Sequence, residues 1–202
     1  MLHALVRSSL LPCASLLLAL SGCFSPAKVQ THRTAIDQQV TAAAVKAAVA
    51  ALDLELLDRA PVYRLRLSGL ADADLDWVRV CLRRRLAELG VVTTDADAPD
   101  AMTLEASVEY AGSDIESTLI GFPIYIPGSA SPLADVSLYK STTQIGRARL
   151  ALLVWTAQGR LLQTIPDVQA TRHFTNMTYL TFFGDFVSTD IEDFVRPGAH
   201  SK

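Results

Sequence analysis

The sequence predicts a single α/β domain, in which a mixed sheet of about five strands is packed by two main helices. Two segments repeat apolar residues at helical spacing, and several others alternate apolar with polar residues as strands do. The 202 residues suit one domain, and a hydrophobic content of 50% excludes a disordered chain. A formal net charge of −3 argues against nucleic-acid binding through phosphate contacts.

The first helix is expected from Thr34 to about Leu52. Thr34 and Asp37 have the spacing of a capping box, and an alanine-rich run follows them. The predicted buried face is narrow and made mostly of small side chains: Ile36, Val40, Ala44, Ala47 and Ala51. Small side chains allow a helix to pack closely on a sheet.

The second helix is expected to begin at the acidic residues Asp72, Asp74 and Asp76, which favour the positive end of a helix dipole. Gly90 is a suitable C′ residue to end it. The predicted buried stripe is Leu75, Val78, Leu82, Leu86 and Leu89. Cys81 within this helix is interpreted as a core or boundary residue.

Alternation predicts strands at 62–67, 91–94, 102–110, 144–156 and 160–172. The segment 102–110 is the clearest, because its apolar side chains alternate strictly with polar ones. Residues 157–160 form a turn, so the last two strands are expected to pair as a hairpin. Pro166 predicts a sheet edge or a bulge.

Residues 112–143 predict a long apolar loop, since Pro123, Pro127 and Pro132 interrupt the segment. One interpretation is a hydrophobic lid over the sheet. The other is a contact surface for a partner protein, for a second copy of the chain or for the bilayer. The candidate contact residues are Asp114, Glu116, Leu119, Gly121, Pro123, Ile124, Ile126 and Lys140. With this loop, the α/β domain spans residues 34–175, and 176–202 form an aromatic-rich tail with a short helix expected near 189–194.

The N-terminus has the pattern of a signal peptide at residues 1–22. Arg7 precedes a largely apolar run, 8–20, that is too short for a comfortable transmembrane helix. Leu20-Ser21-Gly22-Cys23 resembles the bacterial lipobox, which implies a thioether-linked diacylglycerol on Cys23, cleavage before it, and a fatty acyl group such as palmitate on the new amine. The alternatives are an ordinary secretory signal followed by a chance cysteine, or an uncleaved anchor.

Residues 23–33 then form a lipidated tether that holds the domain close to the membrane. Phe24 follows the cysteine, where an aspartate would imply inner-membrane retention in lipoproteins of the enteric type. The expected location is therefore the cell envelope, at the outer membrane and facing the periplasm.

No residue pattern indicates catalysis, a metal site or a cofactor. The sequence contains no P-loop, Gly-x-Ser-x-Gly or His-Glu-x-x-His motif, and its histidines are far apart. Asp114 and Glu116 could act as an acid/base pair, but no third group supports them. Arg83, Arg84 and Arg85 are interpreted as a solvated helix face, with contact to anionic lipid as the alternative.

Two stretches together resemble a family of bacterial lipoproteins of unknown function. They are Gly112-x-Asp114 with Leu119-x-Gly121-x-Pro123, and Leu138-Tyr139-Lys140-Ser141-x-x-Gln144-x-Gly146. This resemblance covers about residues 31–175. More distantly, the order of elements is similar to the periplasmic domain of curli-secretion-type lipoproteins, in which the segment joining the central strands can form a membrane hairpin within an oligomeric pore. Here the corresponding segment is proline-rich and lacks sustained alternation.

The expected function is a non-catalytic interaction or assembly module, anchored to the membrane through Cys23 and bound to an envelope protein or to further copies of itself. An oligomeric secretion or transport component is the first alternative. A small periplasmic hydrolase is the second.

Overall fold

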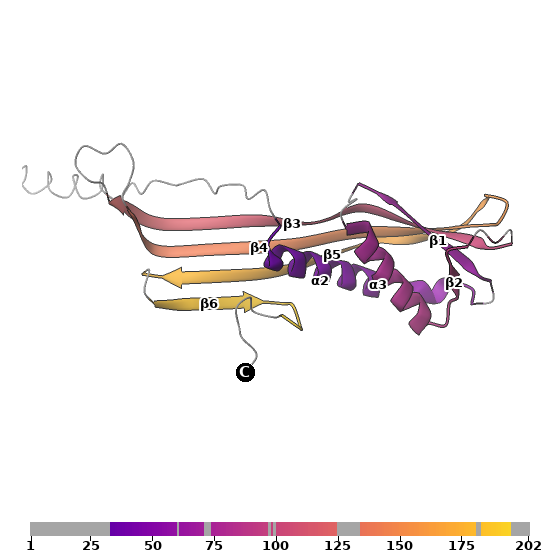
Figure 1. The fold of residues 1–202 in the computed structure, drawn as a ribbon, viewed down its shortest axis with the longest axis horizontal. Helices are drawn as coiled ribbons and strands as arrows, with labels where there is room; N and C mark the ends of the chain where they lie inside the picture. Colours follow the sequence, from indigo (N-terminus) through magenta and orange to yellow (C-terminus); the bar gives the residue numbers. More distant parts are fainter. Residues whose placement is uncertain are drawn as a thin grey trace, which may run out of the picture. The chain divides into compact units, whose positions relative to one another are not determined.

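The computed structural model describes residues 33–59, 61–70, 74–96, 98, 100–124, 134–180 and 183–194. The signal segment, Cys23 and most of the tether lie outside this part. One six-stranded sheet, in the order β2-β1-β3-β4-β5-β6, is accompanied by two α-helices (Figure 1). The elements in chain order are α2 (Ala35–Ala51), a 3-10 turn (Leu54–Leu56), β1 (Tyr63–Gly69), α3 (Leu75–Glu88), β2 (Thr93–Thr94), β3 (Met102–Ile124), β4 (Ala134–Trp155), β5 (Leu161–Tyr179) and β6 (Phe183–Thr189). The predicted α/β class is confirmed, with six strands in place of about five.

By contacts the chain divides into two compact units. The helix unit consists of residues 30–116, 143–175 and 188–202; the described part of the strand unit lies within 117–142 and 176–187. Because β3, β4 and β5 are long, each contributes residues to both units. Each unit is described separately below.

The two helices of the helix unit begin and end as the sequence predicts. The Thr34 hydroxyl accepts a hydrogen bond from the Asp37 amide at 3.1 Å, and the Asp37 carboxylate accepts one from the Thr34 amide at 2.8 Å, which completes the capping box. Gly90 follows the C-cap of α3 with a φ of 77°, the left-handed conformation that glycine adopts most easily.

The sheet combines a parallel and a meandering part. β1 is parallel to both β2 and β3, and α3 provides the crossover from β1 to β2. β3 to β6 then follow in sequence order, with a short connection after Trp155 that forms an antiparallel hairpin.

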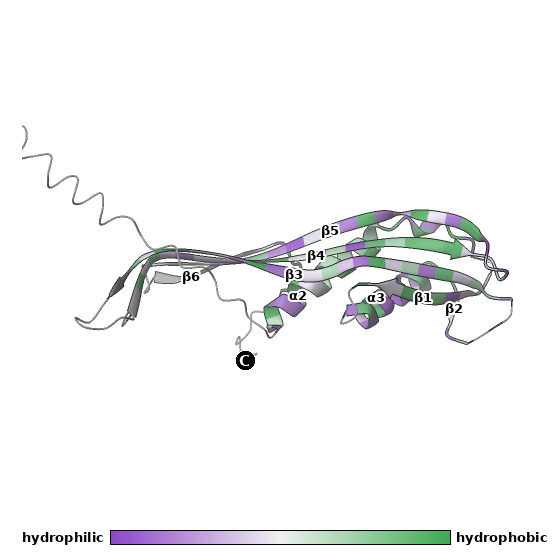
Figure 2. Ribbon diagram, turned by 90° about the horizontal axis from the view of Figure 1, so that it is seen from above, coloured by the Kyte–Doolittle hydropathy of each residue, from purple (hydrophilic) through white to green (hydrophobic). Residues whose placement is uncertain are grey.

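The core of the helix unit lies between the two helices and one face of the sheet (Figure 2). Alternate side chains of β3 and β4 point into it, as the period-2 pattern predicts. The buried sheet residues include Leu104, Ala106, Val108, Ala148, Leu150, Leu152 and Val154, and the helices contribute Val40, Ala44, Val45, Ala48, Val49, Val78, Leu82 and Leu86.

The burial of α2 differs in detail from its predicted stripe. Val40 and Ala44 are buried as predicted, but Ile36, Ala47 and Ala51 are only partly buried or exposed. Thr41, Val45, Ala48 and Val49 are buried in their place, together with the capping Asp37. The helix thus presents a broader and rotated face to the sheet.

Gly146 sets how closely α2 approaches β4. A Cβ atom on Gly146 would lie 2.1 Å from the carbonyl oxygen of Val40 and 2.9 Å from the amide nitrogen of Thr41. Since the helix backbone occupies the space a side chain would fill, only glycine allows this contact.

The opposite face of this sheet carries polar side chains that bind one another. Arg149 pairs with Glu109 at 3.1 Å and donates from Nε to Asp167 at 2.7 Å. Glu105 accepts from Trp155 Nε1 at 2.9 Å and from the Ser68 hydroxyl at 3.1 Å. Glu105 and Glu109 therefore alternate with the core residues of β3.

The alternation breaks once in β3 and once in β5. Val108 and Ala111 both contact the core although they are three residues apart, and so do Ile165 and Val168. An extra residue in each strand, as in a β-bulge, explains this. The second break contains Pro166, where the sequence predicts a sheet edge or a bulge.

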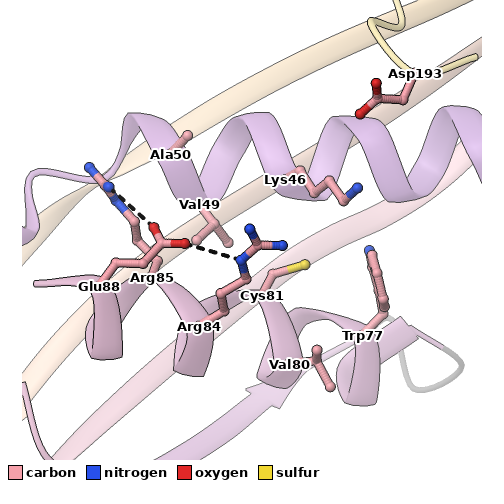
Figure 3. A pocket seen from close by; sticks show the side chains of 10 residues that line it. All are labelled: Lys46, Val49, Ala50, Trp77, Val80, Cys81, Arg84, Arg85, Glu88 and Asp193. Carbon is pink, nitrogen blue, oxygen red and sulfur yellow. Dashed lines mark hydrogen bonds and ion pairs between the residues drawn. The ribbon is translucent and has the colours of Figure 1, made fainter.

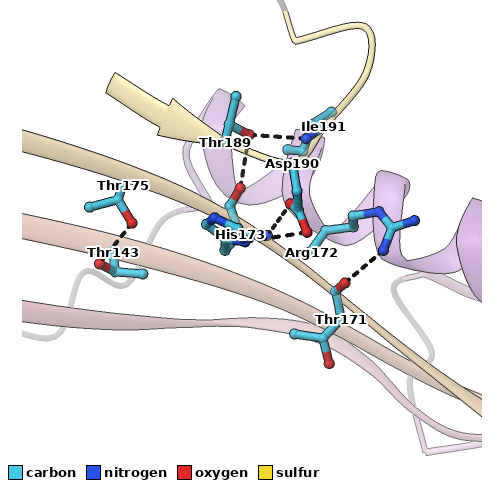
Figure 4. Close-up of polar contacts among 8 residues, drawn as sticks. All are labelled: Thr143, Thr171, Arg172, His173, Thr175, Thr189, Asp190 and Ile191. Atoms are coloured by element: carbon cyan, nitrogen blue, oxygen red, sulfur yellow. Dashed lines mark hydrogen bonds and ion pairs between the residues drawn. The ribbon is translucent and has the colours of Figure 1, made fainter. Parts of the chain in front are cut away.

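The end of β6 is fixed to β5 around His173 (Figure 4). The amide of His173 donates to Asp190 at 2.7 Å, and the Thr189 hydroxyl donates to the His173 carbonyl at 2.8 Å. Beyond it, the rings of Phe174 and Phe194 stack at 4.7 Å.

The predicted loop at 112–143 is wrong for its described residues. β3 continues to Ile124 and β4 begins at Ala134, so most of the segment is regular strand, and it is not a lid. The prolines suggested an irregular chain, but Pro123 lies within β3 next to its end. The predicted tail is likewise wrong where it is described, because β5 reaches Tyr179 and β6 occupies 183–189, with no helix at 189–194.

Candidate functional site

The strand unit exposes apolar side chains without a core of its own. None of its described side chains is buried, and seven large apolar ones are exposed. These are Ile120, Phe122, Leu138, Tyr179, Leu180, Phe186 and Val187, with Phe186 56% and Phe122 53% exposed. We call these residues the strand-unit apolar surface. Exposed apolar groups gathered in one small unit are typical of an interaction surface.

Aromatic rings connect three strands of this unit. The ring centroids of Tyr139 in β4 and Tyr179 in β5 are 5.2 Å apart, and those of Tyr179 and Phe186 in β6 are 5.7 Å apart. The second pair meets edge to face, an arrangement that aromatic quadrupoles favour. The three rings therefore form one connected aromatic row across β4, β5 and β6.

The structure places the predicted contact residues on strands. Asp114, Glu116, Leu119, Gly121, Pro123 and Ile124 lie on β3, and Lys140 lies on β4. Asp114 and Glu116 belong to the helix unit, while the others belong to the strand unit. Ile126 and Cys23 lie outside the described residues.

Asp114 is engaged in an ion pair. Its carboxylate accepts from Arg147 at 2.6 Å, next to a surface hollow of about 550 Å³ bordered by Tyr110, Gly112 and Gln169. The break in the alternation of β3 turns Asp114 toward Arg147, on the face opposite the core. Glu116 is exposed.

A second hollow lies between the two helices, within the helix unit (Figure 3). This interhelix pocket has a volume of about 460 Å³ and is lined by Lys46, Val49, Ala50, Trp77, Val80, Cys81, Arg84, Arg85, Glu88 and Asp193. Lys46 Nζ lies 5.9 Å from the centre of the Trp77 ring, within range of a cation–π interaction. No sequence pattern predicts the pocket, since no motif links Lys46 on one helix to Trp77 on the other.

The three consecutive arginines of α3 bind acidic neighbours. Arg83 pairs with Asp95, Arg84 donates from Nε to Glu88 at 3.1 Å, and Arg85 lies 3.6 Å from the other oxygen of Glu88. Arg84 and Arg85 border the interhelix pocket, so the three do not form one uniform solvated face.

Cys81 lies half-buried in the same pocket, as its predicted boundary position requires. Burial raises the pKa of its thiol, and the positive charges of Lys46 and Arg84 partly oppose that rise. The thiol is thus protonated at neutral pH and is a poor nucleophile.

Within the described ranges, histidine, cysteine, aspartate and glutamate side chains form no group that could hold a metal ion. None of the helices described there is both long enough and apolar enough to cross a membrane.

No family model matches the chain, and neither does any curated protein. Among solved structures, the chain is similar to the rare lipoprotein B from Shewanella oneidensis, with 19% sequence identity and a TM-score of 0.25 over 55% of this chain and 68% of that one. That neighbour is named a lipoprotein, but a likeness of this size assigns no activity, ligand or partner to the present chain. The finer resemblances drawn from the sequence stay predictions.

Proposed function

We propose that the protein is a membrane-anchored lipoprotein of the bacterial cell envelope that acts as a non-catalytic interaction or assembly module. The observation that carries this proposal is the strand-unit apolar surface, which leaves seven large apolar side chains in water. A lasting exposure of this kind is unfavourable, at about 25 cal/mol per Å² of apolar area, so a covering partner would stabilise it.

The anchor of this module is Cys23. The lipobox Leu20-Ser21-Gly22-Cys23 supports lipidation, since it directly follows an apolar run of signal-peptide length. Two or three acyl chains give stable membrane attachment, whereas a single chain does not. We assign the module to the outer membrane, on its periplasmic side, because Phe24 takes the place of a retention aspartate.

No catalytic role is proposed for Asp114 and Glu116. The Asp114 carboxylate is neutralised by Arg147 at 2.6 Å, whereas a general base needs a free carboxylate within reach of its substrate.

An oligomeric secretion or transport component is the second candidate. The same exposed strands favour it, since a second copy of the chain could cover the strand-unit apolar surface as well as a different protein could. The number of subunits distinguishes the two.

The anchor is tested by fractionation and mass spectrometry of the full chain expressed in bacteria. We expect a mature peptide that begins at Cys23 with acyl mass, and we expect Cys23→Ser to move the protein out of the membrane fraction. An unmodified mature N-terminus, or a Cys23→Ser protein that stays in the membrane, contradicts the anchor.

The contact surface is tested by photo-crosslinking in cells. A benzophenone amino acid is placed at Phe122 or Phe186, with Leu162 in the helix unit as the control of equal exposure, 58%. Crosslinks specific to Phe122 and Phe186 support the contact surface: a second copy as product favours the oligomer, and a different envelope protein favours the module. Equal or absent crosslinking at all three positions rejects it.

A further inference from the structure

We propose that the interhelix pocket is a binding site for a small apolar carboxylate, meaning one carboxylate group on an aliphatic or aromatic body. This site lies wholly within the helix unit. It does not depend on the strand-unit apolar surface or on the anchor. Its volume of about 460 Å³ falls within the range of small-molecule sites, roughly 300–1,000 Å³.

The floor of the pocket is apolar and incompletely covered. Val49 and Ala50 on α2 and Trp77, Val80 and Cys81 on α3 line the pocket (Figure 3). Trp77 is 38% exposed and Val80 is 55% exposed. An apolar body placed there would remove these side chains from water, which is favourable in proportion to the area covered.

Two cations with free hydrogen-bonding capacity border this floor. Lys46 has no ion-pair partner among the residues that the structure describes, and its ammonium group stands over the Trp77 ring. Arg84 uses Nε for Glu88, which leaves its two terminal nitrogens available. Figure 3 shows Lys46 on α2 reaching toward Trp77, and Arg84 beside Cys81 on α3.

The charges of both cations act on the thiol of Cys81. Lys46 and Arg84 lower its pKa against the larger effect of burial, so both positive charges act within the pocket.

The pocket lining contains fewer carboxylates than cations, and one of the carboxylates is paired with arginines. Glu88 is held by both Arg84 and Arg85, while Asp193 borders the pocket from the segment after β6. Three cations against two carboxylates leave the lining with an excess positive charge. A guanidinium fork matches the plane of a carboxylate, so a carboxylate is the anion that fits the remaining donors of Arg84.

The test measures protection of Cys81 from alkylation in the full chain. Membranes containing the protein are treated with N-ethylmaleimide, and the modified fraction of the Cys81 peptide is read by mass spectrometry. The probes are 4-phenylbutyrate, its neutral amide 4-phenylbutanamide, and acetate, which carries the charge without the apolar body.

We expect saturating 4-phenylbutyrate to slow alkylation at least fivefold, and the amide and acetate to slow it less than twofold. Loss of a charge-assisted contact weakens binding about tenfold. Lys46→Met should therefore raise the half-protecting concentration by about that factor, and Lys46→Arg should restore most of the protection. Arg79→Met is the matched control, since Arg79 is a half-exposed cation of α3 that pairs with Asp76 outside the pocket.

Equal protection by the acid and the amide would overturn the proposal, since the cations would then contribute nothing. Protection by acetate alone, no protection by any probe, or an unchanged response in Lys46→Met would overturn it as well. None of these results bears on the anchor or on the strand-unit apolar surface.

Discussion

Replacing Gly146 by alanine adds one methyl group at the point where α2 touches β4. The new Cβ would lie 2.1 Å from the Val40 carbonyl oxygen, and real Cβ atoms essentially never approach closer than 3.0 Å. The helix backbone must therefore withdraw by at least 0.9 Å, the difference of the two distances. The carbonyl oxygen belongs to the helix backbone, and the position of a Cβ atom is fixed by the backbone that carries it. No side-chain rotation can therefore relieve the contact.

The cost follows from the side chains that move with the helix. Three buried valines of α2, Val40, Val45 and Val49, each contribute about 2 kcal/mol when fully buried. A gap of 0.5–1 Å forfeits roughly a quarter to a half of a packing contact. The expected loss is about 1.5–3 kcal/mol, which agrees with the usual cost of overpacking. For a chain of this size, it lowers the melting temperature by about 3–12 °C.

Thermal unfolding followed by circular dichroism measures this loss. The control is Gly112→Ala, because a Cβ at Gly112 would meet no atom within 4 Å. We expect the control to melt within about 2 °C of the wild type. If Gly146→Ala melts together with Gly112→Ala, the close approach of α2 to β4 is wrong.

Three further predictions concern local stability. Thr34→Ala removes the side-chain half of the capping box on Asp37 and should cost about 1 kcal/mol in urea unfolding, whereas Thr34→Ser should cost little; equal stability of both variants would exclude the cap. Gly90→Ala forces alanine to a φ of 77° and should cost about 1 kcal/mol by the same assay, a strain that Gly90→Asn should partly relieve. Burial, and secondarily the charge of Asp58, raise the pKa of the Tyr63 phenol above its unfolded value, so its contribution is fully present below about pH 10 and is lost as pH rises through the folded pKa. Stability of the wild type should therefore fall in alkaline solution, and that of Tyr63→Phe should fall less; parallel pH profiles would refute the assignment to Tyr63.

The sequence predicted the helix unit well, because burial on one face leaves a periodic pattern. From 102 to 108 every second residue packs toward the core and the residues between are more polar and less buried, so the strand is readable from polarity alone. The capping box at Thr34 and the glycine stop at Gly90 were readable for a similar reason, since both satisfy local backbone requirements.

The strand unit was missed because that pattern is absent from it. Neither face of 117–122 or 136–142 is buried, so polarity has no reason to alternate there. β3 and β4 also run for 23 and 22 residues, whereas a usual strand has about 3–10 residues. Strand-length statistics therefore predict an earlier end for both strands. Prolines and glycines then made a loop the natural interpretation.

The interhelix pocket was unreadable for a different reason. Lys46 and Trp77 meet only because α2 and α3 pack on the same face of the sheet. Each residue by itself fits the ordinary composition of an amphipathic helix. A site made across two elements without a spacing motif becomes visible only in three dimensions.

The position of β1 in the sheet has a consequence for the order in which the chain folds. β1 is made before both of its neighbours, and the seven residues from Tyr63 to Gly69 pair with β3, whereas only two of them pair with β2. The crossover through α3 therefore gives only a two-residue ladder between β1 and β2, which is too short to be stable by itself. The pairing register of β1 is determined only after β3, which begins at Met102, has been synthesised. A nascent chain that ends before β3 should stay unstructured on the ribosome, with α3 and β1 open to proteases. Once β3 has left the ribosome, the parallel pairs β1–β2 and β1–β3 should form together in one cooperative step.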